Sequence, residues 1–231
     1  MFHNEMAVIK SCSPKNLRRG VNSLKKLQKQ LPLLWLLSIP LIGILYTLQN
    51  HVRPVVHVLS TQFDRATPFI PFFSVFYFIW YPFIFITLYL ILQQRRSAYY
   101  QTLAAVCFGI LVANFTFLIF PTYVPRPQLG SGWNFFVPIT YRLDEPYNGF
   151  PSIHVLTCYL MLRGAAILPK RSSWAVSIMA CLIILSTLFI KQHVIADMAA
   201  GIALGEIVFR MTGRLIKERQ QPLTQDSVVE L

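Results

Sequence analysis

Three short polar segments of the chain combine residue types that bind and transfer phosphate. They are Pro121-Thr-Tyr-Val-Pro-Arg126-Pro127, Tyr147-Asn-Gly-Phe-Pro151-Ser152-Ile-His154 and Lys191-Gln-His193-Val-Ile-Ala-Asp197. In the third segment, His193 and Asp197 are four residues apart, so a helix places both side chains on one face. Asp197 can then accept a hydrogen bond from one ring nitrogen and leave the other for nucleophilic attack or general base catalysis. A helix-capping or packing pair is the structural alternative for this spacing.

The other two segments supply groups that fit an anion. Ser152 after Pro151 predicts a helix N-terminus, whose exposed N–H groups attract phosphate, and His154 lies just inside it as a candidate proton donor. Arg126 stands between two prolines that stiffen its backbone, and a guanidinium can bind phosphate through two parallel hydrogen bonds. Lys191 could add a second positive charge. The alternatives are a plain cap for Ser152, a buried hydrogen-bonded His154, and Arg126 and Lys191 at the membrane edge.

The rest of the chain is mostly apolar. Of its 231 residues, 55% are hydrophobic and 13% are charged, whereas soluble domains carry about 25% charged residues. The apolar residues form six blocks that predict membrane spans, at about 31–48, 69–92, 99–120, 153–168, 173–190 and 194–211. We therefore predict an all-α polytopic membrane protein, a six-transmembrane helical bundle over 31–211. A basic N-terminal tail (1–30), with a short amphipathic helix as an alternative, precedes it, and a C-terminal tail (212–231) follows.

The basic residues predict the orientation of this bundle. Of the 21 Lys and Arg residues, sixteen fall in the tails and in every second loop, and five fall on the other side. Cytoplasmic loops are rich in Lys and Arg, so we expect cytoplasmic termini and extracytoplasmic loops at 49–68 and 121–150. All three polar segments then meet at one extracytoplasmic site, and we expect a bacterial plasma membrane. The net charge of +12 follows from this rule, so we expect the bilayer and no nucleic acid as a partner.

These residues together resemble the motifs of the type 2 phosphatidic acid phosphatase superfamily, integral membrane lipid phosphatases and phosphotransferases. The resemblance covers about 31–211. The matches are, in chain order, Arg126-Pro127, then Pro151-Ser152 with His154, then His193 with Asp197.

The resemblance implies a mechanism without a metal ion or other cofactor. It implies that His193 attacks phosphorus to form a phosphohistidine, that Asp197 orients His193, and that His154 protonates the leaving group before water hydrolyses the intermediate. Arg126, Ser152 and Lys191 are then the residues expected to bind the phosphate of a membrane lipid.

Two departures from the family pattern bear on the substrate. The usual lysine seven positions before the arginine of the first motif is Ile119, and the arginine of the third motif falls at Thr187. Lys191 could supply the missing charge. The form P-T-x-x-P-R-P with N-x-F-P-S-x-H and K-Q-H-x-x-x-D resembles the inositol phosphorylceramide synthase branch and its bacterial relatives.

Four functions remain open at this point. The leading one is a phosphatase of phosphatidic acid, phosphatidylglycerophosphate or a polyprenyl phosphate or diphosphate. The closest alternative is a phosphotransferase that passes the group to an alcohol, because both reactions use the same residues. A hydrolase with His154, His193 and Asp197 as metal ligands and a non-catalytic transporter or scaffold are the others. The sequence does not indicate the oligomeric state.

Overall fold

The computed structural model describes residues 31–51, 54–129 and 136–220, with side chains to residue 216. The tail predicted at 1–30 and the last part of the tail predicted at 212–231 lie outside the described residues. The chain divides into two compact units, Met1–Ser38 and Ile39–Leu231. The first includes the short 3-10 helix η1 (Trp35–Leu37), and the second holds all three polar segments.

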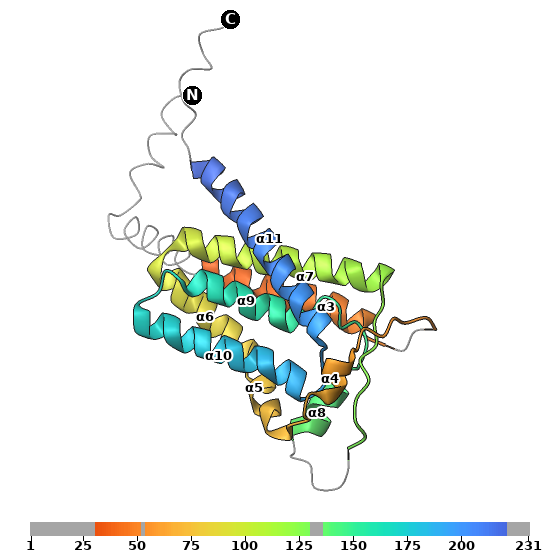
Figure 1. The fold of residues 1–231 in the computed structure, drawn as a ribbon. Coiled ribbons are helices and arrows are strands. Elements are labelled where there is room, and N and C mark those ends of the chain that lie inside the picture. Colours follow the sequence, from red (N-terminus) through yellow and green to blue (C-terminus); the bar gives the residue numbers. More distant parts are fainter. Residues whose placement is uncertain (1–30, 52–53, 130–135, 221–231) are drawn as a thin grey trace, which may run out of the picture. The chain divides into compact units, whose positions relative to one another are not determined.

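Helices form most of the second unit (Figure 1). The elements, in chain order, are α3 (Ser38–Gln49), α4 (Gln62–Ala66), the 3-10 helix η2 (Pro71–Phe73), α5 (Ser74–Phe78), α6 (Trp80–Gln94), α7 (Arg96–Ile119), α8 (Phe136–Leu143), α9 (Ile153–Ala165), α10 (Lys170–Phe189) and α11 (Ile195–Gln220). Among the described residues, β-pairing is limited to two isolated bridges, His57 with Thr122 and Tyr123 with Tyr147. The predicted all-α class is confirmed.

Four helical segments are long and apolar enough to cross a membrane. They are Leu31–Gln49, Pro71–Gln94, Arg96–Ile119 and Lys170–Phe189, and they coincide with four of the six predicted spans. The span predicted at 153–168 corresponds to α9, which has only 13 residues, and a full crossing takes about 20. The span predicted at 194–211 falls on the 26-residue α11, which begins one residue later, at Ile195. A polytopic helical membrane protein is therefore confirmed, and crossings by α9 and α11 stay predictions.

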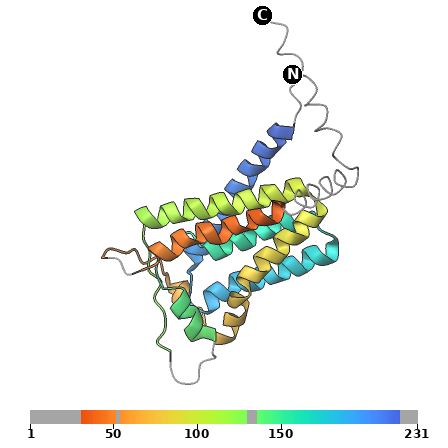
Figure 2. The same ribbon diagram turned by 180° about the vertical axis from the view of Figure 1, so that it is seen from behind.

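Helix α9 lies at the centre of the second unit, packed against α6, α7, α10 and α11 (Figures 1 and 2). A helix that is apolar all round belongs in a core, and the fully buried side chains of α9 include Val155, Leu156, Cys158, Leu160 and Met161. Gly201 lets α11 approach the start of α9, since a Cβ there would lie 2.8 Å from the Ser152 carbonyl oxygen. Small residues allow such close helix packing.

The loops at 49–68 and 121–150 carry the short helices α4 and α8 and are joined by backbone hydrogen bonds. The His57 N–H donates to the Pro121 carbonyl and the Tyr123 N–H to the His57 carbonyl, both at 2.9 Å. Within the second loop, the Asn148 N–H donates to the Thr122 carbonyl at 2.9 Å. The first and second polar segments are therefore held together, beside the end of the bundle at which α9 and α11 begin (Figure 1).

Candidate active site

His193 lies in the loop between α10 and α11, four residues before Asp197 in the first turn of α11. The N–H groups of Gln192 and His193 both donate to the Thr187 carbonyl, at 2.9 and 3.0 Å. Asp197 Oδ2 is 3.3 Å from His193 Nδ1 and accepts the N–H of Val194 at 3.1 Å. The side chains of His193 and Asp197 are 7% and 1% exposed. This buried pair orients the imidazole with Nε2 pointing away from the carboxylate.

His154 lies in the first turn of α9, with its ring centroid 5.6 Å from that of His193. The rings of Tyr77 and Trp80 pack against it, with centroids at 4.4 and 4.0 Å. The indole N–H of Trp80 donates to Thr157 Oγ1 at 2.8 Å, which fixes the indole against the next turn of α9. Two aromatic side chains, Tyr77 and Trp80, thus hold this histidine in place.

Ser152 is the N-cap of α9, and its hydroxyl accepts the N–H of Val155 at 3.3 Å. Its own N–H donates to the Asp197 carbonyl at 3.1 Å, which ties the starts of α9 and α11 together. The Thr122 hydroxyl accepts the N–H groups of Gly149 and Phe150, at 2.8 and 3.1 Å. These bonds bring the three polar segments to one place. The hydroxyl of Ser152 caps helix α9, and its expected contact with phosphate stays a prediction.

The Arg126 guanidinium holds the loop that carries His193. Its Nη2 donates to the Asp144 carbonyl at 2.8 Å and to Gln192 Oε1, and its Nη1 donates to the Tyr141 carbonyl at 3.4 Å. The guanidinium carbon lies 4.4 Å from the centre of the Tyr141 ring. Burial raises the pKa of Tyr141 to about 12, against the opposing effect of Arg126. Arg126 therefore braces the residue before His193, and phosphate binding by its remaining donors stays a prediction.

Lys191 is bound to α4. Its Nζ donates to the carbonyls of Asp64 and Thr67, at 2.6 and 2.5 Å. Burial lowers the pKa of Lys191, and the charge of Asp64 partly offsets this. Asp64 Oδ1 accepts the N–H of Ile195 at 2.8 Å. Burial raises the pKa of Asp64, but hydrogen bonds from Thr61 and Ile195 outweigh burial, so that its pKa is lowered. The phosphate contact expected of Lys191 is a prediction that these bonds do not test.

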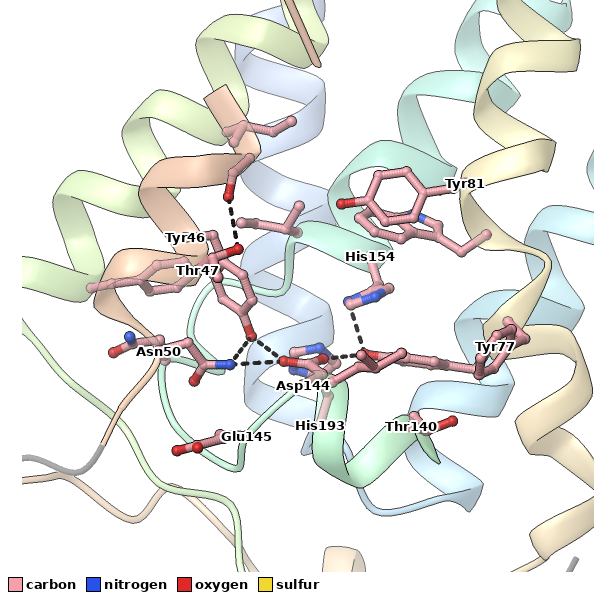
Figure 3. A pocket seen from close by; sticks show the side chains of 18 of the residues that line it. Tyr46, Thr47, Asn50, Tyr77, Tyr81, Thr140, Asp144, Glu145, His154 and His193 are labelled. Atoms are coloured by element: carbon pink, nitrogen blue, oxygen red, sulfur yellow. Dashed lines mark hydrogen bonds between the residues drawn. The ribbon is translucent and has the colours of Figure 1, made fainter. Parts of the chain in front are cut away.

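A cavity of about 450 Å³ opens beside the two histidines (Figure 3). In the described part of the chain, His154 and His193 line it, whereas Arg126, Ser152 and Lys191 do not. Its polar lining includes Tyr46, Asn50, Tyr77, Thr140, Asp144 and Glu145, and its apolar lining includes Ile39, Ile110, Phe117 and Ile153. The cavity therefore joins a polar end at the histidines to an apolar wall between helices.

Residues of all three polar segments have buried polar atoms without a protein partner. Among the described residues they include Arg126 Nε, Gln192 Nε2, His193 Nε2, Asp197 Oδ1 and Asn148 Oδ1. A buried polar group left unpaired costs about 1–3 kcal/mol, so several in one place are typical of a site that binds a polar ligand. Two of the five are N–H donors suited to phosphate oxygens, and His193 Nε2 can carry a lone pair.

Sequence reasoning missed Asp144, the residue directly after α8. Its carboxylate accepts hydrogen bonds from the hydroxyls of Tyr46 and Tyr77 and from Asn50 Nδ2. Its spacing to those partners in the sequence carries no signal, because they lie 98, 67 and 94 residues away. The described residues contain no group of three or more His, Cys, Asp or Glu side chains placed to hold a metal ion. The absence of a metal requirement stays a prediction.

The fold and the site define a polytopic helical membrane protein with two facing histidines, one of them paired with a carboxylate. A family model described as PAP2 superfamily (PAP2_3) matches residues 51–211, more than half of the chain. The protein therefore belongs to the PAP2 superfamily, and this membership supports a phosphatase or phosphotransferase type of enzyme that acts on lipid phosphates. No curated protein and no solved structure matches the chain.

Proposed function

We propose that this protein is a metal-independent lipid phosphate phosphatase that works through a phosphohistidine on His193. The observation that carries the proposal is the buried His193 itself. Its Nδ1 faces Asp197, its Nε2 has no protein partner among the described residues, and its ring lines the cavity opposite His154. An imidazole that is oriented by a carboxylate and free at the other nitrogen is suited to nucleophilic attack.

In the first half of the proposed reaction, His193 Nε2 attacks phosphorus while the bond to the lipid oxygen breaks. The leaving oxygen takes the electron pair of that bond and a proton from His154. Asp197 stabilises the positive charge that develops on the His193 ring, as the carboxylate of a catalytic triad does. The products are the lipid alcohol, or a lipid phosphate where the substrate is a diphosphate, and phosphohistidine.

In the second half, water attacks phosphorus and the bond to His193 breaks. His154, now neutral, takes a proton from the water, and inorganic phosphate leaves. An alcohol bound in place of water would receive the phospho-group by the same step, which is the transferase alternative. We rank hydrolysis first because the described parts of the loops at 49–68 and 121–150 contain no separate module for a second substrate.

The substrate we propose is a phosphomonoester or diphosphate of a membrane lipid, of the phosphatidic acid, phosphatidylglycerophosphate or polyprenyl phosphate type. The apolar wall of the cavity, which Ile39, Ile110 and Phe117 help to form, supports a ligand with a hydrocarbon chain attached to its phosphate. The match to the inositol phosphorylceramide synthase branch rests on the motif forms alone. The phosphate is proposed to be stabilised by Arg126, Ser152 and Lys191. Each does so either by direct contact or by holding the backbone around the site.

The test is phosphate release by the detergent-solubilised protein from a panel of lipid phosphates in EDTA, with labelled alcohols present and with His193→Ala in parallel. We expect metal-independent release that is absent in the variant. Label that moves onto an alcohol with little free phosphate would establish the transferase alternative. Release that needs a divalent cation, or that persists in His193→Ala, would contradict the proposal.

A further inference from the structure

A second carboxylate, Asp144, faces the same cavity as the histidines (Figure 3). Its Oδ1 accepts the Tyr46 hydroxyl and Asn50 Nδ2, the latter at 3.0 Å, and its Oδ2 accepts the Tyr77 hydroxyl. Both carboxylate oxygens thus accept hydrogen bonds. The donors are Tyr46 in α3, Asn50 directly after α3, and Tyr77 in α5. These bonds fix the position of the carboxylate relative to the cavity.

Tyr77 connects this carboxylate to His154. Its ring lies against the His154 ring, and its hydroxyl oxygen is 3.5 Å from His154 Nδ1. Because the hydroxyl donates its own proton to Asp144, its oxygen can only accept from the imidazole. His154 Nδ1 then carries a proton, and Nε2 is left to face the substrate. The 3.5 Å separation is long for a hydrogen bond, as is common before a ligand is bound.

We propose that Asp144, acting through Tyr77, is the positioning residue of His154, so that each histidine of the site has its own carboxylate. Asp197 contacts His193 directly, and Asp144 reaches His154 through one phenol. The proposal rests on the proposed function, in which His154 is the proton donor. In the transfer step the proton on Nε2 passes to the leaving oxygen, the proton on Nδ1 stays, and Asp144 remains ionised throughout.

The indirect link suits a site that must also bind phosphate. A carboxylate in direct contact with the phosphate would repel it, whereas Asp144 is occupied by two phenols and an amide, and its backbone carbonyl accepts from Arg126. The groups that face His154 are Tyr77 from α5, Trp80 from α6 and His193. Asp144, which Tyr77 connects to His154, is placed to stabilise a buried imidazolium.

The test uses substrates that differ in their need for a proton donor. A lipid alkoxide needs protonation as it leaves, whereas 4-nitrophenolate does not. We compare Asp144→Asn, Tyr77→Phe and the double variant with the wild type on phosphatidic acid and on 4-nitrophenyl phosphate. Since general acid catalysis supplies roughly 10²–10⁴ in rate, we expect kcat on the lipid to fall by at least roughly tenfold and KM to change little. The aryl phosphate should be far less affected, and the double variant no worse than either single variant.

Tyr46→Phe is the matched control, because it also removes a phenol from Asp144 but leaves the contact with His154. In Tyr46→Phe, the ratio of turnover on the lipid to turnover on the aryl phosphate should stay close to the wild-type ratio. In Tyr77→Phe this ratio should fall, although the phenylalanine retains the ring that packs on His154. Equal slowing of both substrates in Tyr77→Phe and Asp144→Asn would overturn the role of Asp144. This result would not contradict the proposed function, because His193→Ala tests that function separately.

Discussion

At the scale of single residues, the site is built from side chains that are fixed by more than one bond. Asp197 Oδ2 accepts the Val194 N–H and lies 3.3 Å from His193 Nδ1, and the Asp197 carbonyl accepts the N–H of Ser152. Gly149 leaves the room that this carboxylate needs, since a Cβ there would lie 2.9 Å from Asp197 Oδ2. The position of Asp197 is therefore determined by residues from two of the three polar segments.

Replacing Asp197 by Asn tests its role in orienting His193. An amide cannot stabilise a positively charged imidazole and can favour the wrong tautomer, so kcat should fall by roughly 10²–10⁴. The fold should survive, because Asn retains an oxygen that can accept the Val194 N–H. Circular dichroism and thermal unfolding check the fold, and steady-state phosphate release gives kcat. A variant with wild-type kcat would show that Asp197 does not assist His193.

The residue scale also shows what sequence alone could predict of the site. The pairing of His193 with Asp197 and the capping by Ser152 were predictable because the residues involved lie within four positions of each other in the sequence. The helix that this spacing suggests for both members of the pair begins only at Ile195, so His193 lies in the loop before it. Asp144 was not predictable, because its partners Tyr46 and Tyr77 come from distant helices. The bonds of Lys191 to α4 span 127 and 124 residues, so no local pattern could indicate them.

At the scale of elements, α4 holds the loop that carries His193. Lys191 donates to two carbonyls of the α4 region, and Asp64 accepts the N–H of Ile195 at the start of α11. The N–H of Ile70 also donates to the Phe189 carbonyl at 2.9 Å. The end of α10 and the start of α11 are thus held in position by residues 64–70.

Lys191→Met distinguishes holding the loop from binding phosphate. If Lys191 acts by holding the loop, kcat should fall by roughly tenfold, the effect of a small misplacement of a reacting group, while KM for the lipid changes little. A rise in KM with kcat retained would instead indicate uniform binding of the substrate phosphate. Arg65→Met, which removes an exposed cation from α4, should alter neither constant.

Asp64 gives the α4 contact a defined pH dependence. Its pKa is lowered in the folded protein, so the ionised carboxylate stabilises the fold above the usual pKa of Asp, about 3.9. This contribution is lost as the pH falls through the lowered pKa. The melting temperature of Asp64→Asn in detergent should lie below that of the wild type at pH 6, and the gap should close towards pH 3. A gap that is constant over this range would contradict the assignment.

The element scale also limits what the apolar pattern could predict. The spans at 31–48, 69–92, 99–120 and 173–190 follow from long apolar runs, and the structure has helices there. Helix α9 is short and packs against four other helices. Its apolar residues are therefore explained by burial within the protein as well as by contact with lipid. Helices α4 and α8 have five and eight residues, too few for a periodic pattern to be distinguished from a loop.

At the scale of the whole molecule, the second unit has two distinct ends. The loops with α4 and α8 lie at the end that holds the site, and the α6–α7 and α9–α10 turns lie at the other (Figure 2). Lys and Arg are concentrated in the tails and at the end with the α6–α7 and α9–α10 turns, which predicts that this end is cytoplasmic. On this prediction, we expect the site to face the extracytoplasmic side of the membrane.

Cysteine labelling in intact cells tests this orientation. In a variant without the native cysteines, Glu145→Cys lies at the exposed rim of the cavity and Gln94→Cys at the exposed end of α6. A membrane-impermeant maleimide should label position 145 in intact cells and position 94 only after permeabilisation. The reverse pattern would place the site in the cytoplasm.

The most direct test of the central claim is to isolate the phosphorylated enzyme. Rapid mixing with lipid phosphate labelled on phosphorus, followed by an alkaline quench, preserves phosphohistidine for detection on the protein. We predict transient label on His193 in the wild type, none in His193→Ala, and label that persists in His154→Ala loaded with 4-nitrophenyl phosphate. Turnover without any protein-bound phosphate, or label on a residue other than His193, would contradict the account.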